Sequence, residues 1–209
     1  MKRPLIALVT ALLGSAAAVA APVTMHNFEY GYENLHSAQF GSLGTGALMG
    51  EYNGGASNSF ITFCNDLYQH FSWNVTYTDY TLVANGAPNG LTITQADMLG
   101  KLYTTAGAID NHDKSVAFQL AVWELTHDAT PGDIFAGAFS IDSGGTTAQL
   151  DLTQSWLHYA TDANSANSYV VTRLYSPTAQ DFLVAHRNDV PEPTAAWLVG
   201  LEIGRASCR

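Results

Sequence analysis

The feature that most constrains the fold is a change of hydrophobic period along the chain. Residues 59–64 and 75–83 are rich in β-branched and aromatic residues, which predicts two strands. Residues 94–104, 113–127 and 147–160 repeat apolar side chains with the period of a helix. Residues 169–175 and 182–185 return to the strand pattern. This order predicts an α+β domain, a β-rich sandwich or barrel-like fold with about three helices inserted in the middle.

Two of these segments allow a finer prediction. In the strand expected over 75–83, alternation places Thr76, Thr78 and Tyr80 on one face and Val75 and Tyr77 on the other. Turns are expected at 53–55 and 85–90, where Asn and Gly cluster.

The segment 113–127 has the strongest helical pattern. Asp113 is expected to cap its N-terminus, and Pro131-Gly132 follow its end. The stripe of this helix that we expect to be buried comprises Val116, Ala117, Leu120, Ala121, Trp123 and Leu125.

The N-terminus has the three parts of a secretory signal peptide. Lys2 and Arg3 are basic, residues 5–13 are apolar, and Ala18-Val19-Ala20 fits the A-x-A cleavage pattern. The apolar run is too short for a membrane-spanning helix. We therefore expect residues 1–20 to be removed on export, which leaves a single globular domain over 21–189 of about 170 residues.

The expected exported domain is acidic. The whole chain has a formal net charge of -10. Between residues 21 and 189 the basic side chains are Lys101, Lys114, Arg173 and Arg187. A protein with so few cations has no surface suited to a phosphate backbone, so nucleic acid is excluded as a partner.

The C-terminal segment begins with Val190-Pro191-Glu192-Pro193, whose prolines interrupt regular structure ahead of an apolar run. This motif, followed by apolar residues up to Leu201, resembles the PEP-CTERM sorting signal of Gram-negative bacteria, a region also called an ice-binding-protein-type C-terminal domain. The resemblance implies processing by an exosortase-type enzyme. It also implies transient membrane contact through the native tail, and a final place in the cell envelope, on the outer surface or outside the cell.

The tail also departs from that family. Its apolar run ends at Glu202, well short of the roughly 20 residues that a membrane span needs. We therefore interpret residues 190–201 as a truncated sorting tail and residues 202–209 as a non-native extension.

Cysteine usage singles out one residue of the domain. The chain contains 2 cysteines, Cys64 and Cys208, and only Cys64 lies within 21–189. An unpaired cysteine in an exported protein is buried, paired between chains, or used in chemistry.

Gln119 stands within an otherwise apolar part of the strongest predicted helix, where its amide must be satisfied or consumed. Phe63-Cys64, together with a hydrophobic-Gln-x-x-hydrophobic-Trp pattern ending at Trp123, resembles bacterial thioester domains, which are surface adhesin modules. The resemblance implies an internal thioester between Cys64 and Gln119, formed with loss of ammonia and open to a surface amine. The residue after the cysteine is usually apolar in that family, and here it is Asn65.

Three residues that follow the cysteine are candidates to assist proton transfer in such a reaction: Asp66, Tyr68 and His70. All three side chain types can donate or accept a proton, but the sequence gives no geometry for them.

Two functions remain open. One is a sorted surface adhesin with the internal thioester. The other is a noncovalent structural or binding protein associated with exopolysaccharide and biofilm, in which Cys64 is a buried free thiol and Gln119 bonds a backbone group. No catalytic dyad is evident, so neither enzymatic activity nor a cofactor is expected.

A metal site is a weaker hypothesis. Asp110 and Asp113 offer clustered oxygens that could bind Ca²⁺. Their spacing is not that of a known calcium loop, so we expect no metal there.

Overall fold

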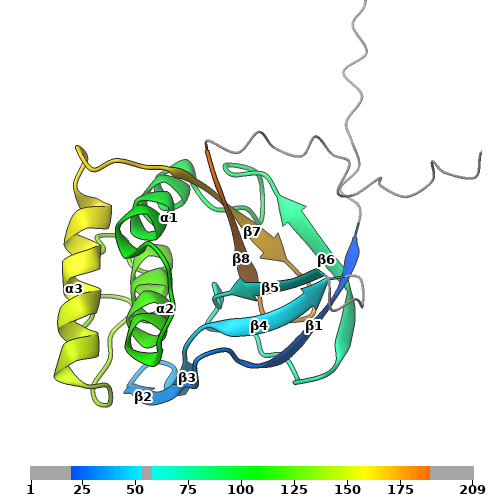
Figure 1. The fold of residues 1–209 in the computed structure, drawn as a ribbon, viewed down its shortest axis with the longest axis horizontal. Helices are drawn as coiled ribbons and strands as arrows, with labels where there is room; N and C mark the ends of the chain where they lie inside the picture. The colour runs from blue at the N-terminus through cyan, green and yellow to red at the C-terminus, as the bar shows by residue number, and fades with distance from the viewer. Residues whose placement is uncertain (1–19, 53–57, 189–209) are drawn as a thin grey trace, which may run out of the picture.

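The computed structural model describes residues 20–52 and 58–188, in which three helices lie beside a curved β-structure (Figure 1). The strands are β1 Ala21–Phe28, β2 Glu33–Ser37, β3 Gly41–Thr45, β4 Leu48–Tyr52, β5 Ser59–Thr62, β6 Thr76–Val83, β7 Tyr169–Tyr175 and β8 Phe182–Arg187. The helices are α1 Ile93–Ala106, α2 His112–His127 and α3 Thr147–Thr161. This arrangement confirms the predicted α+β class. The expected signal peptide, except for its last residue Ala20, lies outside the described residues, as do the turn expected at 53–55 and the expected sorting tail.

Six strands form one antiparallel sheet in the order β5-β4-β1-β6-β7-β8, and β2 pairs with β3 in a separate hairpin. The two outer strands of the large sheet approach each other. Leu183 N donates to Phe63 O at 3.2 Å, and Asn65 N donates to Asp181 O at 2.9 Å. The sheet therefore curls into a nearly closed barrel, because pairing its edges satisfies main-chain groups that would otherwise stay open.

A β-bulge in β6 changes which side chains face the core. Tyr77 pairs with Val23 and Tyr80 pairs with Ala21, so β6 has one residue more than β1 over this stretch. Tyr80 is 1% exposed, and its hydroxyl donates to Gln180 O at 2.6 Å. The prediction that Tyr80 shares a face with Thr76 and Thr78 is wrong, because the extra residue shifts the alternation by one position.

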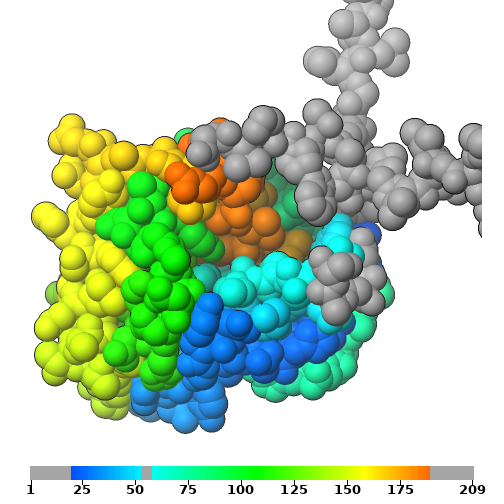
Figure 2. Space-filling model, viewed as in Figure 1, coloured from blue at the N-terminus to red at the C-terminus, as the bar shows by residue number. Residues whose placement is uncertain are grey.

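Helix α2 runs through the middle of the molecule, in contact with α1, α3 and β3. The β2–β3 hairpin lies against it at one edge of the molecule (Figure 2). Every residue from Ser115 to Leu125 is buried, so the predicted one-sided stripe is too narrow. Because α2 is enclosed in this way, the buried side chain of Gln119 needs a hydrogen-bond partner within the protein.

The start of α2 differs from the prediction. The N-cap is Asn111, whose side-chain oxygen accepts a hydrogen bond from Lys114 N at 3.0 Å. Asp113 lies one position inside the helix, in its first turn. The prediction that Asp113 caps the helix is therefore wrong, because a capping oxygen must lie ahead of the first turn to reach its free N–H groups.

Candidate functional site

Cys64 lies two residues past the end of β5, at the seam of the barrel, where residues 63–65 meet residues 181–183. It forms an isolated antiparallel bridge with Phe182 of β8. Cys64 is 7% exposed, and it forms no disulfide within the described residues. The thiol therefore belongs to the segment where the two edge strands of the sheet, β5 and β8, come together.

Gln119 reaches this seam from α2, where its side chain is 0% exposed. Its Nε2 donates to Cys64 O at 2.9 Å, and its Oε1 accepts from Cys64 N at 2.8 Å. The carboxamide is thus tied at both ends to the main chain of the residue that carries the thiol. The fold brings together the two residues that the sequence singled out, although 55 positions separate them.

Both members of the pair are shielded from solvent. Burial raises the pKa of the Cys64 thiol, and the nearby Asp66 carboxylate raises that pKa further. The thiol is therefore protonated at neutral pH, and any reaction in which its sulfur acts as a nucleophile needs a proton acceptor.

The three predicted assisting residues lie in different environments. Asp66 is buried, and its Oδ1 accepts a hydrogen bond from Tyr68 N at 2.7 Å. Tyr68 is 76% exposed, and His70 is also exposed. Within the described residues, no hydrogen bond joins any of the three side chains to Cys64 or Gln119.

Sequence reasoning missed His127, the last residue of α2. Its Nε2 lies 3.0 Å from Asn65 O, beside the candidate cysteine. Gln119, Trp123 and His127 recur every fourth residue and so lie along one side of the helix. That spacing is visible in the sequence, but nothing local indicates that this side of the helix meets residues 64 and 65.

Some buried polar atoms of α2 and of the seam have no hydrogen-bond partner among the described residues. They include Asn65 Oδ1 on the seam and, on α2, Trp123 Nε1 and Glu124 Oε2. Burial also raises the pKa of Glu124 to about 7, against the opposing effect of hydrogen bonds from Gly132 N and Asp133 N. Helix α2 and the seam therefore carry buried polar groups that the contacts among the described residues do not all satisfy.

The carboxylates of the candidate calcium site have other partners. Asp110 Oδ1 lies 2.9 Å from Lys114 Nζ, and Asp113 Oδ1 accepts from Gln149 Nε2 at 2.9 Å. No group of three or more His, Cys, Asp or Glu residues suited to a metal occurs in 20–52 and 58–188. Both aspartate side chains are therefore paired with other side chains of the protein, Lys114 and Gln149.

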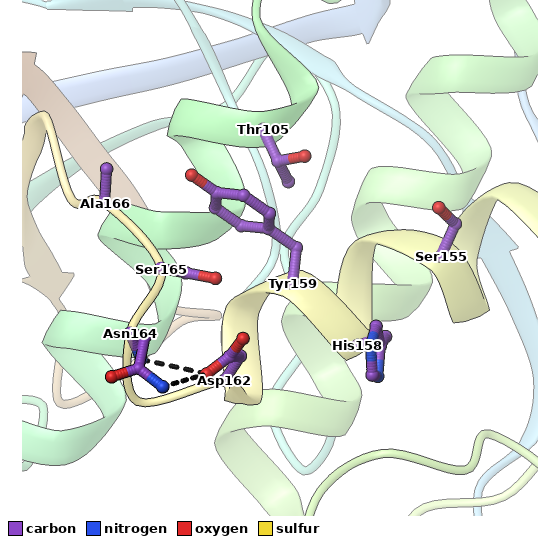
Figure 3. A pocket seen from close by; sticks show the side chains of 8 residues that line it. All are labelled: Thr105, Ser155, His158, Tyr159, Asp162, Asn164, Ser165 and Ala166. Carbon is purple, nitrogen blue, oxygen red and sulfur yellow. Dashed lines mark hydrogen bonds between the residues drawn. The ribbon is translucent and has the colours of Figure 1, made fainter.

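A polar pocket of about 510 Å³ lies elsewhere, between the end of α1, the end of α3 and the turn after α3 (Figure 3). His158 and Tyr159 line it from α3, and Asp162 accepts two hydrogen bonds from Asn164 at its rim. None of its lining residues belongs to α2 or to the Cys64 segment. This pocket is therefore separate from the residues that carry the candidate chemistry.

The sequence matches no protein-family model, and it matches no curated protein. Among solved structures, the chain is similar to one described as the Bacillus anthracis TIE protein, with a TM-score of 0.42 and 10% identity. The alignment covers 82% of this chain and 40% of that one, so this chain spans less than half of its length. Within the described residues, no helix has the length and apolar character needed to cross a bilayer.

Proposed function

We propose that this chain is an exported surface protein that forms a thioester between Cys64 Sγ and Gln119 Cδ and attaches through it to amines on a target. One observation carries the proposal: the Gln119 carboxamide is bound to both main-chain groups of Cys64, at 2.8 and 2.9 Å. The attachment is stoichiometric, so the protein is an adhesin rather than an enzyme.

The proposed bond formation follows from this arrangement. The sulfur attacks Gln119 Cδ, the thiol proton goes to the departing nitrogen, and ammonia leaves. Cys64 N–H already donates to Gln119 Oε1, the atom that gains negative charge in the tetrahedral intermediate. Holding the two groups together in a buried site replaces intrinsic reactivity with a high effective concentration.

Export and sorting rest on the two ends of the sequence. The signal peptide over 1–20 supports secretion, and Val190-Pro191-Glu192-Pro193 supports processing by an exosortase-type partner. Together they favour a location in the cell envelope or outside the cell, where surface amines are available.

A noncovalent function is the second candidate, favoured by a different aspect of the same contact. The two hydrogen bonds of Gln119 engage both its oxygen and its nitrogen, as expected for a structural tie. Burial also keeps the Cys64 thiol protonated. In this alternative the protein binds an envelope partner such as exopolysaccharide without a covalent bond.

Intact mass spectrometry of the full chain distinguishes the two. With a thioester, the protein is lighter than its sequence by one ammonia, and methylamine adds to Gln119. The Cys64→Ala variant should show neither change. An unmodified mass, with a thiol that alkylates only after unfolding, would reject the thioester and leave the noncovalent function.

A further inference from the structure

We propose that His127 is the general base that takes a proton from the amine attacking the Cys64–Gln119 thioester. The proposal rests on the proposed function and adds to it the residue that allows a primary amine, such as a lysine side chain, to react.

The position of His127 is the first support. From one side of α2, Gln119 binds the main chain of Cys64 and His127 Nε2 lies 3.0 Å from Asn65 O. Two side chains of a single helix thus hold two consecutive residues of the barrel seam. Any amine that reaches the acyl carbon arrives where this helix side and the seam meet.

The hydrogen bond also defines which nitrogen can act. A carbonyl oxygen only accepts, so Nε2 must carry the proton and donate it to Asn65 O. The lone pair of the neutral ring then lies on Nδ1, which is the atom that can receive a proton.

The surroundings keep this ring neutral. Burial lowers the pKa of His127, and the Arg173 charge lowers it too, whereas the Asn65 carbonyl and the Asp66 carboxylate oppose this shift. Tyr68, another titratable group, packs against the ring, at 6.0 Å between ring centroids. The base form is therefore present at physiological pH.

His127 is half-buried, whereas Cys64 and Gln119 are both buried. The ring of His127 contacts those of Phe40 and Tyr68, and Tyr68 is 76% exposed. In contrast, Cys64 is 7% and Asn65 is 4% exposed. These aromatic rings connect the surface to the seam, and aromatic faces attract the ammonium group of an approaching lysine.

The step balances without another reactant. The amine nitrogen bonds to Gln119 Cδ, the bond from Cδ to Cys64 Sγ breaks, and the sulfur takes the bonding electrons. The proton received by His127 Nδ1 from the amine passes to that sulfur, so the ring returns to its neutral form and the thiol is restored. Because burial disfavours a free thiolate at this position, proton delivery to the sulfur assists its departure.

Two substitutions test this role on the full chain. His127→Gln keeps a side-chain N–H that can donate to Asn65 O, whereas His127→Phe keeps the ring packing but has no polar atom. Both should take up methylamine about 100-fold more slowly than the wild type, the usual effect of losing a general base. Added imidazole should restore part of the rate. His158→Gln, on the exposed side of α3, should react like the wild type.

The pH profile separates a base from a structural role. The protonation of methylamine changes the rate by the same factor for the wild type and for the variants at each pH. The ratio of the wild-type rate to the variant rate therefore reports only the protonation of His127. That ratio should be large above the pKa of His127 and fall toward one below it. Variants that react at the wild-type rate, with the same profile, would overturn the role of His127 and leave the thioester intact.

Two other outcomes are also decisive. A variant that forms no thioester, and is not rescued by imidazole, would assign His127 a structural role and overturn the proposal. A wild-type protein that has no thioester would reject the proposed function, and the inference about His127 with it.

Discussion

Gln119 binds Cys64 through the main chain of that residue, with one hydrogen bond donated and one accepted. The contact does not use the cysteine side chain, so we expect Cys64→Ala to retain it. This allows the structural value of the tie to be measured separately from the chemistry of the thiol, in a Cys64→Ala background that cannot form a thioester.

In that background, adding Gln119→Ala should lower the free energy of unfolding by about 3 kcal/mol, because a buried N–H and a buried C=O lose their partner. Urea denaturation of the single and double variants measures the difference. Gln154→Ala on α3, a partly exposed glutamine, should cost far less. Equal losses at the two glutamines would show that the tie contributes nothing specific.

Glu124 should make the protein less stable as the pH rises. Burial raises its pKa in the folded state from 4.5 to about 7, so the folded protein holds a proton that the unfolded chain releases. Stability from this group is fully present below about pH 4.5 and is lost as pH rises through about 7. Glu124→Gln should remove this dependence and be the more stable protein at pH 8 by on the order of 2 kcal/mol.

Thermal or urea unfolding from pH 4 to 8 checks this prediction. Asp151→Asn, at an exposed position of α3, is the matched control and should leave the slope unchanged. A wild type and a Glu124→Gln variant with parallel stability profiles would contradict the assignment of the raised pKa to Glu124.

The buried Asp181 depends on Arg173. Arg173 Nε donates to its carboxylate at 2.8 Å and Nη2 also contacts it, while Ser176 N donates at 2.7 Å. Arg173→Met should therefore cost about 3–5 kcal/mol, because it leaves a buried charge without its partner. The double variant Arg173→Met/Asp181→Asn should recover part of this loss. Additive losses in a denaturation cycle would contradict a direct coupling.

The stability of the protein should depend on the capping oxygen of Asn111 and not on a capping oxygen of Asp113. Asn111→Ala should lower the free energy of unfolding by about 1 kcal/mol, because Lys114 N loses its acceptor. Asn111→Asp should retain wild-type stability, since aspartate caps equally well and carries a charge that favours a helix N-terminus. Thermal unfolding of both variants checks this, and an equal loss in each would argue against capping.

Local patterns in the sequence were sufficient to predict whether most elements are helices or strands. The strand expected over 169–175 is the observed β7, and the three helical segments correspond to α1, α2 and α3 with shifts at their ends. The period of apolar residues carries this information, because it reflects which face of an element is buried. The strands β2, β3 and β4 were not predicted individually, since five-residue strands contain few repeats of the pattern.

The sequence by itself determined the α+β class and marked Cys64 and Gln119, the latter because a polar amide in an apolar helix must be satisfied. Only the tertiary structure decided that these residues meet. Closure of the barrel at Phe182 places Cys64 at a seam, and the enclosed helix α2 then covers it with Gln119 and His127. The same applies to the β6 bulge, which depends on pairing with β1. These are long-range contacts, and their geometry is set by how strands and helices pack, which no local period records.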